Sequence, residues 1–151
     1  MNKHLVTIIA LAAFAGLSFA SCSKPGSSSS SATVVGTWTM QRQATDNNGN
    51  GIADASEWST AASQGITLAT LTVNSGGSGS EHYKASFTVA GTTYNIDTME
   101  NFTWALENSN TYIAVTQGGT TTHMHLDTLT ANLMTTKDTT GGTASWTSFT
   151  R

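Results

Sequence analysis

Residues 82–98 read His-Tyr-Lys-Ala-Ser-Phe-Thr-Val-Ala-Gly-Thr-Thr-Tyr-Asn-Ile-Asp-Thr, and this stretch decides the fold class. From Tyr83 to Val89 apolar side chains alternate with polar ones, which is the period of a half-buried β-strand. Ala90-Gly91 can turn the chain, and Thr92–Thr98 follows as the antiparallel partner, with Tyr94 and Ile96 facing inward. The stretch therefore predicts a β-hairpin.

The same alternation recurs through residues 33–151, which we expect to form one β domain. Further strands are predicted at 34–43, 66–73, 102–106, 112–116, 121–130, 132–137 and 143–150, with a Gly/Ser loop at 74–80 and one short helix at 53–63. Eight or nine short strands predict an all-β, antiparallel up-and-down barrel, because closure removes exposed sheet edges. A β-sandwich is the alternative.

The first residues have the composition of a bacterial export signal. Lys3 is followed by an uncharged stretch from Leu5 to Ala20, too short and wrongly flanked for a membrane-spanning helix. Phe19-Ala20-Ser21-Cys22 resembles the lipobox of bacterial lipoproteins, and this resemblance implies that residues 1–21 are a signal peptide and that Cys22 is lipidated. Ordinary secretory cleavage after Ala20 is the alternative. Acyl chains on Cys22 would anchor the protein to a membrane.

Residues 22–32 are mostly serine and predict a flexible tether between the anchor and the domain. Ser23 follows the cysteine where, by the same resemblance, aspartate favours inner-membrane retention, so we expect the outer membrane of the bacterial envelope. Charged residues are only 10% of the chain and the net charge is −3. The basic residues of the domain are scattered singly, which argues against nucleic acid as a partner. The sequence leaves the oligomeric state open.

Gly36-Thr37-Trp38 stands in the first predicted strand of the domain. It resembles the Gly-x-Trp signature of lipocalins and their shorter bacterial relatives. The resemblance implies a barrel plugged at one end by Trp38, against an arginine of the last strand, for which Arg151 is the candidate. It also implies a carrier of a small apolar ligand, held at the barrel mouth by inward residues such as Phe87, Tyr94, Trp104 and Tyr112. The rival interpretation is a structural or adhesive module with a solid core.

Residues 46–57 fit the pattern D-x-[DN]-x-[DN]-G-x₅-E of a Ca²⁺ loop. A hard cation takes six to eight oxygen ligands, and we expect them from Asp46, Asn48, Asn50, the Ile52 carbonyl, Asp54 and Glu57. The run resembles dockerin-type and thrombospondin-type-3 loops more than an EF-hand, because a strand is predicted before it. Ca²⁺ would then be structural and bound with a Kd on the order of 10⁻⁵ to 10⁻³ M. A loop without an ion is the alternative.

Two weaker signals concern catalysis and zinc. His123, His125 and Asp127 alternate along one predicted strand, so they share a face, but spacing assigns no third protein ligand for Zn²⁺. The domain has no G-x-S-x-G or H-E-x-x-H motif and no cysteine. We therefore expect a protein that is not an enzyme.

Overall fold

The computed structural model describes residues 32–151. The predictions for the signal peptide, Cys22 and nearly all of the tether lie outside these residues. The described chain forms nine strands: β1 (Gly36–Thr45), β2 (Trp58–Thr60), β3 (Ile66–Val73), β4 (Ser78–Val89), β5 (Thr92–Glu107), β6 (Tyr112–Gln117), β7 (Thr120–Leu129), β8 (Leu133–Asp138) and β9 (Ser145–Thr150).

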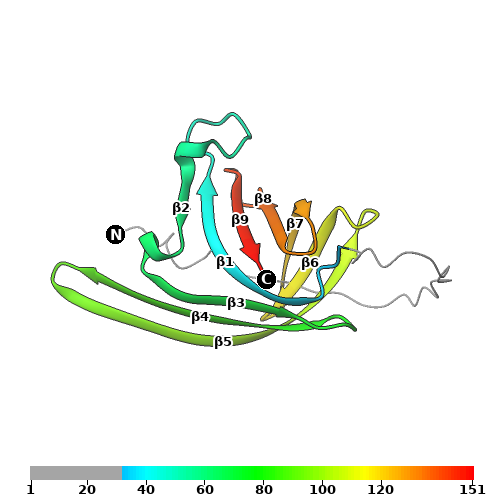
Figure 1. Ribbon diagram of the computed structural model, residues 1–151, viewed down its shortest axis with the longest axis horizontal. Helices are drawn as coiled ribbons and strands as arrows, with labels where there is room; N and C mark the ends of the chain where they lie inside the picture. Colours follow the sequence, from blue (N-terminus) through cyan, green and yellow to red (C-terminus); the bar gives the residue numbers. More distant parts are fainter. Residues whose placement is uncertain (1–31) are drawn as a thin grey trace.

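Eight of these strands form a closed antiparallel barrel. The hydrogen-bonded order runs from β1 through β3 to β9 with each strand beside the next, and β9 pairs with β1 to complete the circle (Figure 1). The ninth strand, β2, pairs only with residues 42–44 of β1. The predicted up-and-down barrel of eight or nine strands is therefore confirmed, and the sandwich alternative is wrong.

Strand β1 changes partners along its length. Residues 36–39 pair with β3, whereas residues 39–45 pair with β9, and the register shifts by one residue between Met40 and Arg42. A bulge of this kind bends a strand and increases its twist. The bend lets one strand pair with β3 through its first half and close the barrel against β9 through its second half, which leads into the loop of residues 46–57.

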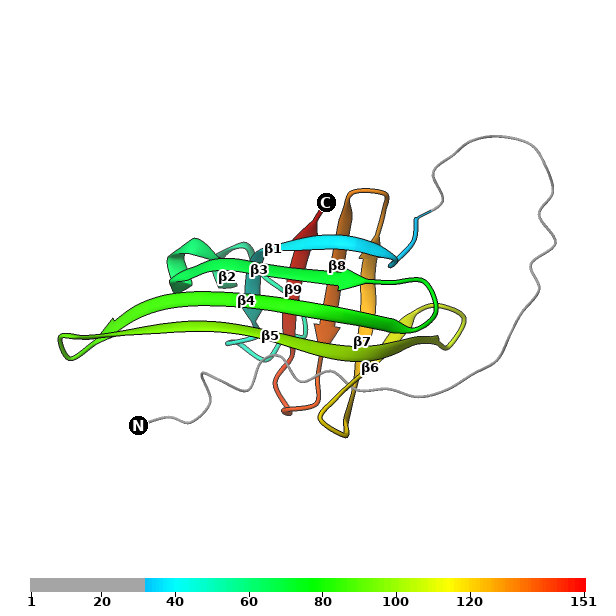
Figure 2. The ribbon, with the colours of Figure 1, turned by 90° about the horizontal axis from the view of Figure 1, so that it is seen from below.

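The β4–β5 hairpin is much longer than its neighbours. Residues 92–103 of β5 pair with β4, whereas only Thr103–Glu107 pairs with β6, which has six residues against the sixteen of β5. The hairpin therefore extends past the rest of the barrel, as Figures 1 and 2 show. The part of β5 that does not pair with β6 is solvated on both faces, with Tyr94 50% and Met99 68% exposed.

The helix predicted at 53–63 is replaced by two 3₁₀ turns, Ala55–Glu57 and Ala62–Gln64, on either side of β2. Trp58 pairs with Ala44 of β1, and this pairing interrupts the helix. The loop expected at 74–80 is also shorter, because β4 already begins at Ser78. Among residues 32–151, no helix has the length and apolar character needed to cross a membrane.

One end of the barrel is closed by a packed core. Val34, Trp38, Val73, Phe102, Ile113, Val115 and Met134 are buried there as one cluster. Gly79 is buried beside it, and a Cβ at this position would lie 2.2 Å from the ring of Phe102. Glycine at position 79 thus lets the phenylalanine ring lie across β4.

Arg151 completes this closed end. Its guanidinium carbon lies 4.0 Å from the ring centroid of Trp38, which is fully buried and donates through Nε1 to the Val34 carbonyl. The same guanidinium donates to the carbonyls of Thr33, Val35 and Ala131. A Cβ at Gly36 would lie 3.0 Å from it, and the φ of +144° there also favours glycine. The predicted contact between Trp38 and Arg151 is confirmed.

Candidate functional site: a cavity in the open half of the barrel

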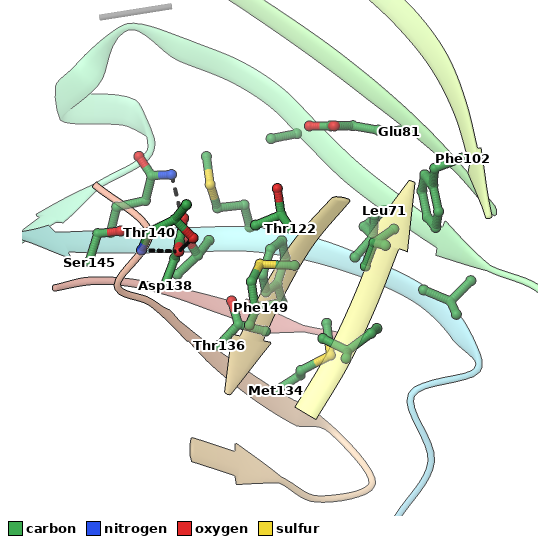
Figure 3. Close-up of a pocket in the computed structure, with 18 of the residues that line it drawn as sticks. Leu71, Glu81, Phe102, Thr122, Met134, Thr136, Asp138, Thr140, Ser145 and Phe149 are labelled. Atoms are coloured by element: carbon green, nitrogen blue, oxygen red, sulfur yellow. Dashed lines mark hydrogen bonds between the residues drawn. The ribbon is translucent and has the colours of Figure 1, made fainter. Parts of the chain in front are cut away.

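The other half of the barrel holds a cavity of about 470 Å³ (Figure 3). Its wall includes Met40, Leu71, Phe102, Met124 and Phe149, contributed by five different strands. Exposed residues of the β6–β7 and β8–β9 turns, among them Thr120, Thr140 and Gly141, line it as well. The cavity therefore reaches solvent at the end opposite Trp38, and a small molecule can enter without the barrel coming apart.

Two carboxyl groups line the cavity, in different surroundings. Asp138 is half-buried, and its Oδ1 accepts hydrogen bonds from the backbone N–H and the hydroxyl of Thr140 (Figure 3). Glu81 is 8% exposed and has Leu71 of β3 on one side and Glu100 of β5 on the other. Burial, and then the charge of Glu100, raise the pKa of Glu81 to about 8. At neutral pH the empty barrel therefore holds Glu81 mainly as the neutral acid.

The loop of residues 46–57 is folded around the side chain of Asp46. Its carboxylate accepts hydrogen bonds from the backbone N–H groups of Gly49, Asn50 and Gly51 at 2.7–3.1 Å. The side-chain amides of Asn48 and Asn50 both donate to Oδ2 of Asp54. Three of the five predicted side-chain ligands are thus in contact with one another, and Asp46 holds the backbone between them.

Glu57, the fifth, closes the other side. Its carboxylate accepts from the backbone N–H groups of Asn47 and Asp54. Ile52 has a 62% exposed side chain, and its N–H donates to the side-chain oxygen of Asn50. Within the described residues no three His, Cys, Asp or Glu side chains lie close enough together to hold a metal ion. The oxygen ligands predicted for the loop are three carboxylates, the two side-chain amides of Asn48 and Asn50, and the backbone carbonyl of Ile52.

The loop is attached to the outside of the barrel, away from the cavity wall. The N–H of Asp46 donates to the carbonyl of Ala144, and Nζ of Lys137 donates to the carbonyl of Gly51. Lys137 also lies 4.8 Å from the ring centroid of Trp146. The loop and the cavity are therefore separate features that share strands β8 and β9.

Residues 34–136 match the family model described as a lipocalin-like domain. The chain belongs to this family. A similar solved structure is japanin from Rhipicephalus appendiculatus bound to cholesterol, with 10% identity, 81% of this chain and 78% of that chain covered, and a TM-score of 0.49. No curated protein sequence matches the chain at a significant level.

In this lipocalin-like domain the four aromatic residues expected at the mouth do not line the cavity. Phe87 and Tyr94 stack on each other, with ring centroids 5.7 Å apart, but on the part of the hairpin that extends beyond the barrel. The indole N–H of Trp104 donates hydrogen bonds to the carbonyls of Asn74 and Ser78 at the closed end. Tyr112 is on the outer face, against His125. Alternation predicted which residues share a face, but the lengths of the strands decide where the cavity lies.

Glu81 is a lining residue that the sequence analysis missed. It is two residues before Tyr83, so it continues the inward face of the first predicted strand. The usable signal was an acidic residue in an otherwise apolar inward series, but the strand had been expected to begin only after a loop ending at Ser80. With β4 beginning at Ser78, Glu81 lies inside the barrel.

The histidines of β7 are engaged separately. Nδ1 of His123 lies 2.8 Å from Glu107 of β5, across the intervening strand β6, and Nδ1 of His125 contacts Asp127. Asp127 also accepts from the indole N–H of Trp146. These pairs lie on the outer face of the lipocalin-like domain, and within residues 32–151 they are not joined by a third ligand that would make a zinc site.

Proposed function

We propose that this protein binds and carries a small apolar molecule in the barrel cavity, as a binding protein and not as an enzyme. The observation that supports the proposal is the cavity itself, because about 470 Å³ falls within the ~300–1,000 Å³ of typical ligand sites. Its wall is mainly apolar, with hydroxyl groups near the opening. Membership of the lipocalin-like family supports the same function.

The size of the cavity also supports a carrier over the rival function. A structural or adhesive module with a solid core requires a filled interior, and a void above ~300 Å³ favours a carrier. Here the apolar cluster around Trp38 fills one half of the barrel and leaves the other half hollow.

Binding of N-phenyl-1-naphthylamine, a neutral apolar dye that fluoresces in dry sites, tests the proposal. Thr136 of β8 lines the cavity, and its neighbour Thr135 is on the opposite face of the same strand. We expect the dye to bind the wild type and Thr135→Phe, and to bind Thr136→Phe at least tenfold more weakly. Melting curves establish that both variants fold. Equal dye binding by the two folded variants, or no binding by the wild type, would contradict a ligand-carrying barrel.

We also propose that the protein is a lipoprotein tied to the bacterial outer membrane through Cys22. The lipobox-like residues 19–22 and the serine-rich residues after them support this part of the proposal. Mass spectrometry of protein purified from bacterial envelopes should find an N-terminal Cys22 carrying acyl chains. A mature chain beginning at Ser21, or a Cys22→Ser variant that stays in the outer-membrane fraction, would contradict it.

The third part of the proposal is that Ca²⁺ stabilises the loop of residues 46–57. The support is the spacing of oxygen ligands together with the contacts of Asn48 and Asn50 with Asp54 and of Asp46 with the backbone between them. We expect Asp46→Ala and Glu57→Ala to lower the melting temperature in calcium and to have a smaller effect in chelator. Asn47→Ala, a change in the same loop outside the ligand pattern, is the control. Equal melting shifts in calcium and chelator would refute the site.

A further inference from the structure

The side chain of Glu81 is an ionisable group in the cavity for which residues 32–151 provide no partner. It is more than nine-tenths buried and lines the cavity, and no hydrogen bond or ion pair to its carboxyl group occurs among residues 32–151. Figure 3 places it across the cavity from Thr136 and Met134. Buried polar groups in proteins are normally hydrogen-bonded, so an unpaired carboxyl facing a cavity indicates a ligand group.

The charges around the cavity determine which ligand group fits. Its lining contains two acids, Glu81 and Asp138, and no basic side chain. The basic residues of the described chain are engaged elsewhere: Arg42 with Trp58, Lys84 with Asp97, Lys137 with Trp146 and Gly51, and Arg151 with Trp38. The histidines 82, 123 and 125 pair with acids outside the lining. A ligand carboxylate or phosphate would therefore meet no positive charge in the lining.

The position of Glu100 strengthens this selectivity. It is directly opposite Glu81 in the β4–β5 ladder, so the two side chains are on the same face of the sheet. Glu100 is exposed and accepts a hydrogen bond from Gln117 of β6. It adds a negative potential beside the buried acid, and opposite charge is attracted to clefts of this kind.

We propose that the cavity binds an apolar amine, with the ligand's ammonium group paired to the Glu81 carboxylate and its apolar body against Leu71, Phe102 and Phe149. This inference rests on the proposed carrier function and specifies its ligand class. In the empty barrel Glu81 keeps its proton, because an isolated buried charge is costly. When the protonated amine enters, Glu81 releases that proton to solvent, and the bound state is an ammonium–carboxylate pair with no net charge.

An alcohol or a carboxylate of the same length lacks this pairing. A hydroxyl group can share one hydrogen bond with neutral Glu81, and a carboxylate would have to be buried beside two acids. Asp138 is the weaker partner for a cation, because Thr140 already satisfies one of its oxygens and it lies near the opening. The amine group is therefore expected at Glu81.

Decylamine, decan-1-ol and decanoate differ only in their head group, and displacement of N-phenyl-1-naphthylamine compares them in dilute, micelle-free solution. At pH 8 we expect decylamine to bind at least tenfold more tightly than decanol, and decanoate to bind most weakly. Between pH 6 and 8 the affinity for decylamine should rise, by up to about tenfold per pH unit, because binding releases one proton from Glu81. The affinity for decanol should not rise.

Glu81→Gln keeps the shape of the side chain and removes its charge, and Glu107→Gln on the outer face is the matched control. The first variant should lose the preference for amine and its pH dependence while still binding decanol; the second should behave as the wild type. Amine and alcohol binding equally to the wild type, or amine binding unchanged in Glu81→Gln, would overturn the inference and leave the carrier function intact. Failure of all three compounds and the dye to bind would overturn both.

Discussion

The two ends of the barrel are built from the same strands but differ in how their buried polar groups are paired. At the closed end Trp38 is fully buried, its indole N–H has an acceptor, and Arg151 donates to three backbone carbonyls. In the open half Glu81 is also buried, yet among residues 32–151 its carboxyl group has neither a donor nor a cation. The closed end therefore satisfies its buried polar groups, whereas the cavity keeps a buried acid without a partner, which costs stability.

The strongest way to break this contrast is to remove the plug. Trp38→Ala should lower the free energy of unfolding by about 3–5 kcal/mol, because a large cavity opens in the packed half of the barrel. Chemical denaturation followed by circular dichroism measures the loss. Trp58 of β2 is the control, because it is only half-buried but also contacts an arginine. The guanidinium carbon of Arg42 lies 4.3 Å from the ring centroid of Trp58. Trp58→Ala should cost much less, and equal losses would show that the closed end has no special role.

A pH titration of stability sharpens the comparison at the open end. The pKa of Glu81 is raised by folding, so the folded state holds a proton that the unfolded chain releases near pH 4.5. The stabilisation is complete below that pH and is lost as the pH rises toward 8, by an amount on the order of 3 kcal/mol. Denaturation at pH 5, 6.5 and 8 should show this decline in the wild type and a flatter profile in Glu81→Gln. Parallel profiles would mean that Glu81 is not the buried acid described above.

A smaller effect separates the geometry of Arg151 from its charge. Arg151→Lys keeps the charge but loses the planar fork that reaches carbonyls on two segments of the chain, and it should cost about 1–3 kcal/mol. Arg42→Lys, which keeps a cation beside the half-exposed Trp58, should cost less than about 1 kcal/mol. Thermal melts of the two variants measure the two losses of stability. An Arg151→Lys protein as stable as the wild type would show that positive charge alone closes the barrel.

The alternation of Tyr83, Ala85 and Phe87 was enough to predict the hairpin, and the recurrence of that period was enough to predict the barrel. The hairpin and the barrel depend on short-range patterns, so they could be predicted from the residues alone. Arg151 was predicted through the resemblance of Gly36-Thr37-Trp38 to the lipocalin signature, and the contact between Trp38 and Arg151 fits that resemblance.

The cavity could not be predicted in the same way. The aromatic residues at 87 and 94 face the same side as Glu81, but whether that side is inside the barrel depends on where β6 stops pairing with β5. That point is set by strand lengths and by the bulge in β1, neither of which alternation reveals. The buried acid was missed for the same reason, since its strand begins earlier than the glycines at 76, 77 and 79 suggested.

The difference in length between β5 and β6 has a further consequence. β6 ends at Gln117, and the two glycines after it reverse the chain with φ values of +56° and +82°, so the ladder with β5 stops at Thr103. The width of the opening is thus governed by where one short hairpin turns back and not by a separate flap. Inserting an even number of residues on each side of the Gly118–Gly119 turn would extend that ladder toward Glu100 and narrow the entrance. The length of this hairpin alone would then adjust the width of the entrance.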